Sequence, residues 1–290
     1  MSLPVRYEIE HISRYRYEWP VRNCIMSVCL NPQNDERQQL LRFDLTTDPA
    51  APHNAELDPF GNTKHVLHIH REHTSLVITA HSIVVTLPGE TPPETLDSSA
   101  WDEIRAASES FADWDYTHPT TLTQSTPALA DFARSNGLEG PGGDPLSALR
   151  ALMSAIHGSF RYVPGSTSVG SPIDQVLESG EGVCQDYAHV MLAVARTWGV
   201  ASRYVSGYVD VSDYADIDET RPGATHAWVE CKLPGLGWVG FDPTNRCLAD
   251  HRHIRIGAGR DYQDVAPTRG VLQGGGAMEL DVEVRVRHLP

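Results

Sequence analysis

The sequence is poor in the features that mark secreted, membrane-spanning and disulfide-rich proteins. None of its apolar runs reaches the roughly 18 residues that a membrane helix needs. The first ten residues lack the basic, apolar and small-residue order of a signal peptide. Only 5 of the 290 residues are cysteine, and no two of them have the CxxC spacing. We therefore expect a cytoplasmic protein with free thiols.

Basic residues are also scarce. Lys and Arg number 23 against 38 Asp and Glu, which gives a net charge of −15. Because an acidic chain repels phosphate backbones, nucleic acid is excluded as the main partner. The 40% hydrophobic and 21% charged residues are typical of a globular protein.

The first third of the chain has the pattern of β-strands. Residues 5–17 alternate between apolar and polar at period two, and later segments up to residue 87 do so less strictly. Turn signals separate these segments, among them Asp58-Pro-Phe-Gly-Asn62. Several strands with regular turns predict an N-terminal antiparallel β-sandwich over residues 1–88.

Helical patterns follow, and then strands return. We expect a linker and a short helix over residues 89–126, and a second domain over 127–290. The strongest helix runs from Cys184 to Trp198 and stops at Gly199. Strands are predicted from residue 202 onward, including a late strand near 278–286 that could join either sheet. The chain is thus expected to run from strands through helices and back to strands.

The most informative segment is Gly180-Glu-Gly-Val-Cys184-Gln-Asp186. The predicted helix begins at Cys184, where backbone N–H groups converge and the helix dipole is positive. This environment favours the thiolate, which is the nucleophilic form of cysteine. A buried structural thiol is the alternative for Cys184 taken alone.

A predicted hairpin supplies a base and its partner. The strands Thr225–Glu230 and Gly237–Asp242 flank a turn near Pro234-Gly235, so paired residue numbers sum to about 468 or 469. His226 and Asp242 sum to 468, so we expect them to lie opposite each other on one face. A carboxylate beside an imidazole fixes its tautomer and orientation.

Together these residues predict nucleophilic acyl transfer at amide bonds. Cys184 attacks the carbonyl, His226 protonates the leaving amine and then activates water or an incoming amine, and Asp242 orients His226. Backbone N–H groups at the helix start, including that of Cys184 itself, would bind the oxyanion. The N–H of Gln185 is a weaker candidate for the same role, and its side chain is expected to cap the helix or face solvent. Hydrolysis and transfer to an amine share the thioester intermediate, and the sequence leaves both open.

Three motifs in order resemble the transglutaminase-like superfamily: Gly-Val-Cys184-Gln-Asp-Tyr-Ala, His226-Ala-Trp-Val-Glu, and Gly-Trp-Val-Gly-Phe-Asp242-Pro-Thr-Asn. The β region with its Asp58-Pro-Phe-Gly-Asn62 turn is similar to the N-terminal domain of bacterial members, and the segment 259–270 resembles the piece after their aspartate. The resemblance implies an α+β protein with a papain-like catalytic core, in which helices pack on an antiparallel sheet. It also implies a Cys184–His226–Asp242 triad and peptide or protein substrates. It implies no cofactor, and the calcium-loop pattern of the animal enzymes is absent from the sequence.

Three aromatic residues are weaker candidates for substrate contact. Trp228 and Trp238 share the predicted triad face, so they either wall a substrate channel or pack beside the hairpin. Tyr262 lies in the family-like segment after the aspartate and could approach the site. The alternative function is a protein-binding module in which the triad chemistry is unused.

Other reactive side chains have simpler interpretations. The histidines at positions 65, 68, 70 and 73 invite a metal site, but no cysteine or carboxylate accompanies them, so a solvated strand face is expected. The same holds for His251 and His253. The remaining cysteines, at 24, 29, 231 and 247, are expected to be packing or surface residues. We therefore predict no metal site.

Overall fold

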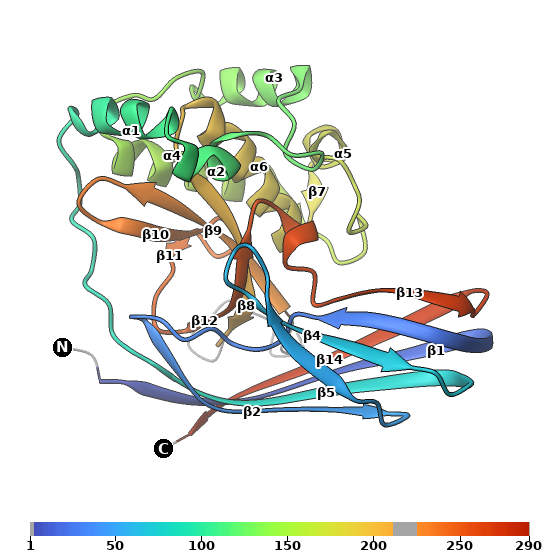
Figure 1. The fold of residues 1–290 in the computed structure, drawn as a ribbon. Coiled ribbons are helices and arrows are strands. Elements are labelled where there is room, and N and C mark those ends of the chain that lie inside the picture. Colours follow the sequence, from blue (N-terminus) through green and yellow to red (C-terminus); the bar gives the residue numbers. More distant parts are fainter. Residues whose placement is uncertain (1–2, 211–224, 290) are drawn as a thin grey trace.

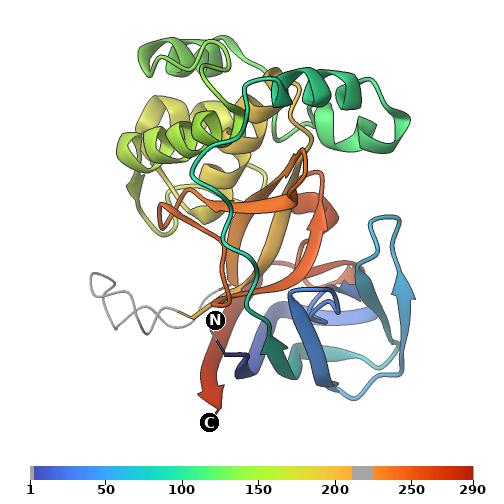
Figure 2. The ribbon, with the colours of Figure 1, turned by 90° about the vertical axis from the view of Figure 1, so that its left-hand side faces the viewer.

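The computed structural model describes residues 3–210 and 225–289. It has the predicted α+β fold: a curled antiparallel sheet formed largely by the first third of the chain, and a second sheet covered by helices (Figure 1). The second sheet lies between the helices and the first sheet (Figure 2). Within the described residues, no helix is long and apolar enough to cross a membrane.

The first sheet is organised around one long strand. Residues of β1 (Val5–Val28) alternate between buried and accessible positions, as the period-two pattern predicts. This strand pairs with four others and bends where its register shifts, between Arg16 and Val21 and again between Arg22 and Ile25. Its partners from the first third are β4 (Thr63–Ile69) and β5 (His73–Thr86), and the outer strands are β2 (Gln38–Asp48) and β3 (His53–Leu57).

The C-terminal strands return to this first sheet. Both β13 (Thr268–Gly274) and β14 (Met278–Leu289) pair with β1 in antiparallel register. The late strand that the sequence left unassigned is therefore part of the N-terminal sheet. Val284 of this strand is buried, whereas Met278, Leu280 and Val282, which alternate with polar residues on the same face, are exposed.

The second sheet carries the helices on one face. Its strand order is β11-β10-β9-β8-β12, all antiparallel, and α6 (Cys184–Thr197) packs against β9. The alternate residues Ala227, Val229 and Cys231 of β9 join the helices in one core. The strands are β8 (Ser202–Val209), β9 (Thr225–Leu233), β10 (Gly237–Asp242), β11 (Cys247–Leu248) and β12 (His253–Gly259).

The remaining helices surround α6, and several begin as the sequence predicts. Asp144 caps α4 by accepting the N–H groups of Leu146 and Ser147. Gly137 takes a φ of 67° just after α3, where a left-handed residue ends a helix. The helices are α1 (Ala100–Ser108), α2 (Trp114–Thr117), α3 (Pro127–Ser135), α4 (Pro145–Ser159) and α5 (Ile173–Ser179), with short 3-10 turns η1 (Phe111–Asp113) and η2 (Tyr262–Asp264) and a two-strand pair of β6 (Arg161–Tyr162) and β7 (Glu181–Gly182).

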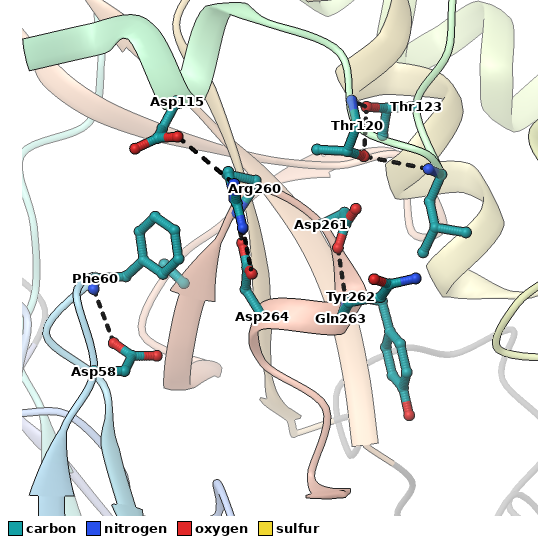
Figure 3. A network of polar contacts seen from close by, with 12 residues as sticks. Asp58, Phe60, Asp115, Thr120, Thr123, Arg260, Asp261, Tyr262, Gln263 and Asp264 are labelled. Atoms are coloured by element: carbon teal, nitrogen blue, oxygen red, sulfur yellow. Dashed lines mark hydrogen bonds and ion pairs between the residues drawn. The ribbon is translucent and has the colours of Figure 1, made fainter. Parts of the chain in front are cut away.

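The turn at residues 58–62 of the first sheet is hydrogen-bonded to the end of β12 in the second sheet. The buried Asn62 amide donates to the Ala258 carbonyl at 2.8 Å, and its oxygen accepts the Ala258 N–H at 2.8 Å. Beside this contact, Arg260 lies over the Phe60 ring at 5.4 Å and pairs with Asp264 (Figure 3). The predicted turn at residues 58–62 thus fixes the start of η2.

Candidate active site

The loop before α6 is shaped by its glycines and by one aspartate. Gly180 ends α5 with a φ of 69°, and a Cβ at Gly182 would lie 2.7 Å from Val176 Cγ2. The Asp186 carboxylate accepts the Val183 N–H at 2.8 Å and the Thr167 hydroxyl at 2.6 Å. Burial raises the pKa of Asp186. These contacts hold the first turn of α6 in a single conformation.

Cys184 is the first helical residue of α6 and is partly exposed. Its thiol lies close enough to the ring of His226 to contribute to the raised pKa of that imidazole. The N–H groups of Asp186 and Tyr187 already donate to the Val183 carbonyl. The first-turn N–H groups of Cys184 and Gln185 are those left to face an oxyanion.

His226 lies at the start of β9 and contacts the third member of the site. Its Nε2 lies 2.7 Å from Oδ2 of Asp242, a fully buried carboxylate. Nδ1 is therefore the ring nitrogen that faces Cys184. Burial alone would lower the pKa of His226, but Asp242 and Cys184 outweigh it and raise this pKa to about 10. The same ion pair holds the pKa of Asp242 well below its usual value despite burial.

The strands of the hairpin pair in a different register from the predicted one, in which paired residue numbers sum to 468 or 469. Observed pairs such as Gly240 with Glu230 sum to 470, so His226 and Asp242 are not directly opposite. Gly235 and Gly237 both take positive φ values, which moves the centre of the turn to Gly235. The parity is correct, so the two side chains share a face and meet diagonally.

Asn245 is a further partner that the sequence reasoning missed. Its Nδ2 donates to Asp242 Oδ2 at 2.7 Å and lies 3.4 Å from Nε2 of His226. The N–H groups of Thr244 and Asn245 donate to the other oxygen, Oδ1, at 3.0 and 3.1 Å. The sequence Asp-Pro-Thr-Asn is a turn signal. In such turns the aspartate side chain typically accepts hydrogen bonds from the backbone N–H groups of the residues that follow.

His253 is the second missed partner, because the sequence indicated a solvated position. It is buried at the start of β12, and its Nε2 lies 3.1 Å from Oδ2 of Asp242. Ligand atoms of His226, Asp242 and His253 lie within 4.8 Å of one another, the spacing of a metal site. Both imidazoles, however, direct a ring N–H at the carboxylate, and a metal would have to displace those protons. We therefore interpret the group as a hydrogen-bonded one.

The other predicted contact residues occupy different places. The Gln185 side chain is buried and donates to the Val169 carbonyl at 3.2 Å. Trp228 is only 1% exposed and packs under His226, with 6.2 Å between ring centroids, so it supports the site rather than lining an open wall. Arg203 lies 4.2 Å over the ring of Trp238, which also contacts Tyr116.

Tyr262 lies on η2, close to the helix that carries Cys184. Its N–H donates to Nε2 of His189 on α6 at 3.3 Å, and its ring stands edge-on to Tyr204 at 6.3 Å. The Tyr204 hydroxyl in turn lies within electrostatic reach of Cys184. Tyr262 is thus in the layer next to the site.

The earlier histidine cluster is only partly solvated. His65 and His73 are buried, which corrects the expectation of a solvated face for these two. His65 Nδ1 lies 3.2 Å from His53 Nδ1. Within the described parts of the chain, these histidines do not form a group of three or more ligand atoms close enough to share a metal. All five cysteines are free, and those at 24, 29 and 231 are buried.

A cavity of about 420 Å³ lies on the sheet face opposite the helices. Trp228, Glu230, His253 and Arg255 are among its lining residues, and Cys184 is not. The cavity thus reaches His253, a partner of Asp242, but is not lined by the thiol.

Comparison with known proteins links this geometry to a family. Residues 133–243 match the model of the transglutaminase-like superfamily, and residues 7–85 match that of the bacterial transglutaminase-like N-terminal region. An uncharacterized protein of Mycobacterium tuberculosis (strain H37Rv) is 36% identical over 94% of this chain and 90% of its own length.

Two further likenesses are more limited. A solved structure of a "putative cysteine protease" from Cytophaga hutchinsonii aligns with a TM-score of 0.77 over 100% of this chain and 92% of its own, at 20% identity, which shows a shared fold. A protein-glutamine gamma-glutamyltransferase of Pseudomonas aeruginosa is 30% identical over 40% of this chain, but this match spans only 18% of that protein.

Proposed function

The chain belongs to the transglutaminase-like superfamily, and from this premise we propose that it is a cysteine-dependent enzyme that cleaves or exchanges amide bonds in peptide or protein substrates. The observation that carries the proposal is the chain of contacts from the Cys184 thiol through His226 to the buried Asp242. A nucleophile, a base and an orienting group in contact are the parts that covalent acyl transfer needs.

The first half-reaction forms a thioester. The Cys184 thiolate attacks the amide carbonyl carbon, and the oxygen takes the negative charge beside the N–H groups of Cys184 and Gln185. The imidazolium of His226 then gives its proton to the nitrogen as the C–N bond breaks, and the amine leaves. Asp242 holds His226 so that Nδ1 faces the sulfur.

The second half-reaction releases the acyl group. His226, now neutral, takes a proton from water or from an amine as that molecule attacks the thioester carbon. The C–S bond breaks, and the thiolate and imidazolium are restored. Water gives a carboxylic acid, and an amine gives a new amide. The likeness to a gamma-glutamyltransferase supports glutamine side chains as acyl donors to be tested first.

Thiol reactivity tests the activated pair without knowledge of the substrate. We expect iodoacetamide at pH 6.5 to alkylate Cys184 at least tenfold faster than Cys247, which is also partly exposed and serves as the internal control. His226→Ala should remove this advantage and leave Cys247 unchanged. Equal labelling of the two thiols, or an unchanged rate in H226A, would refute the proposal.

A product assay separates hydrolysis from transfer. Glutamine-containing peptides are incubated with and without dansyl-cadaverine, a primary amine, and the products are identified by mass spectrometry. Incorporation of the amine shows a transferase, and peptide cleavage or deamidation alone shows a hydrolase. Either product must disappear in Cys184→Ala; a product that persists in this variant would contradict the mechanism.

A further inference from the structure

The carboxylate of Asp242 is shared by two imidazoles, although the mechanism above uses only one. Its Oδ2 lies 2.7 Å from Nε2 of His226 and 3.1 Å from Nε2 of His253. The two rings stand 6.3 Å apart, with Trp228 in contact with both. The carboxylate and the side chain of His253 are almost completely shielded from solvent.

The ring of His253 is held in one orientation. The backbone N–H of Asp250 donates to its Nδ1 at 3.2 Å, and Trp228 packs edge-on at 5.2 Å between centroids. The Asp250 carboxylate oxygen is farther from Nδ1, at 3.5 Å. Burial opposes a charge on His253, but Asp242 and Asp250 outweigh it and raise the pKa of His253 well above its ordinary value. A charged ring carries protons on both nitrogens, and a neutral ring accepts the Asp250 N–H at Nδ1, so Nε2 carries the proton that points at Asp242 in either state.

We propose that His253 is a positioning residue that shares the negative charge of Asp242 and so sets how tightly His226 holds its proton. The inference rests on the proposed function, since it concerns the same triad. A hydrogen bond from a second donor draws electron density from Oδ2 and weakens the attraction of this oxygen for the His226 imidazolium.

This weaker attraction between Asp242 and the imidazolium matters because His226 has to release its proton in each catalytic cycle. A buried, undivided carboxylate would hold the imidazolium so firmly that protonation of the leaving amine becomes slow. A second donor on the same oxygen makes His226 a better acid while the carboxylate stays charged and fixed. The neighbouring Asn245 amide acts on Oδ2 in the same sense.

Several other groups face His253 and enter any reading of pH dependence. Asp250 and Cys247 contact its ring from the segment between β10 and β12, and Asp242 and His226 lie on its far side. The adjoining cavity adds six further ionisable side chains, those of Asp35, Arg37, Glu90, Glu230, His251 and Arg255. A test must therefore change the donor alone and leave these charges in place.

A pair of variants of equal length does so. His253→Gln offers an amide N–H near the position of Nε2, whereas His253→Met has similar size and no donor. We expect H253M to lower turnover of the glutamine-containing peptides at pH 7 at least tenfold. The alkaline limb of its turnover–pH profile should move to higher pH, because His226 releases its proton at higher pH. H253Q should restore both toward the wild type. Equal losses in the two variants, or no loss in either, would overturn the inference.

Two further measurements keep the test decisive. Cys184 alkylation in the wild type and H226A reports on the proposed function itself; if these agree, that proposal fails whatever the His253 variants do. If H253M does not fold, proton NMR of the wild type with ¹⁵N-labelled histidine gives the answer. Two low-field Nε2–H signals are expected, one lost in H226A and the other in H253Q. Absence of the second signal overturns the role of His253.

Discussion

Asp242 lies 2.7 Å from His226 although the hairpin that carries both residues does not pair them. The side chains reach each other diagonally, and the backbone N–H groups of Thr244 and Asn245 anchor the other carboxylate oxygen. The orientation of the carboxylate is therefore set by the turn after β10 and not by the ladder.

This dependence on a fully charged carboxylate predicts the effect of Asp242→Asn. The amide would keep the shape but present an N–H₂ group or a weaker acceptor to His226. We expect turnover to fall by about 10²- to 10⁴-fold, as when an orienting carboxylate is neutralised in other triads. Asp102→Asn, at an exposed position of α1, is the control and should leave activity unchanged. A D242N enzyme within threefold of the wild type would argue against the triad.

The raised pKa of His226 predicts a pH-dependent term in stability. Its folded-state pKa of about 10 exceeds the ordinary 6.5, so the pair with Asp242 stabilises the fold fully below about pH 6.5. This contribution is lost as the pH rises toward 10. We expect the unfolding free energy of the wild type, relative to His226→Gln, to fall by more than about 1 kcal/mol over this window.

Urea titrations at pH 6.5, 8 and 9.5 measure this difference. His70→Gln, at an exposed position, is the matched control and should show no such slope relative to the wild type. A difference between wild type and H226Q that is constant with pH would mean that His226 is not charged in the folded state.

The hydrogen bonds between Asn62 and Ala258 of β12 predict an effect on stability far from the triad. Asn62→Ala leaves the buried N–H and carbonyl of Ala258 without their side-chain partner. Each unsatisfied group should lower the unfolding free energy by about 1–3 kcal/mol. Thermal unfolding should show a lower Tm. Asn54→Ala, at an exposed site of β3, should change the Tm little. Equal Tm values for the two variants would show that this turn is not a structural clamp.

The close packing around Gly207 leads to a prediction about the support of the site by Trp228. A Cβ there would lie 2.2 Å from the Ile254 carbonyl oxygen and 2.6 Å from the Trp228 ring. Gly207→Ala should therefore destabilise the protein by about 1–3 kcal/mol and slow Cys184 alkylation, since Trp228 supports both histidines. Gly140→Ala, where a Cβ meets open space, is the control. A G207A protein as stable and reactive as G140A would show that this packing can adjust freely.

Much of the site followed from local patterns. The apolar period of α6 placed Cys184 at a helix start, and alternation along β9 and β10 placed His226 and Asp242 on one face. The exact register did not follow, because it depends on Gly237 taking a left-handed conformation that lengthens the turn. Local sequence does not specify that choice.

The missed partners are contacts between distant elements. His253 reaches Asp242 because the segment between β11 and β12 runs from one edge of the sheet to the other, with Ala249 packed where Gly240 lacks a side chain. A glycine inside a strand is a signal of close approach, but it does not say which segment approaches. The choice of sheet for β14 was open for the same reason, since its alternation fits either.

The return of β13 and β14 to the first sheet makes the helical core an insertion, tethered to the β domain at both ends. Such a double tether restricts hinge bending between the two units more than a single linker would. A protease cut in the connection between β5 and α1 would also leave the halves joined covalently through the second crossing. The two units should therefore fold and unfold as one cooperative body.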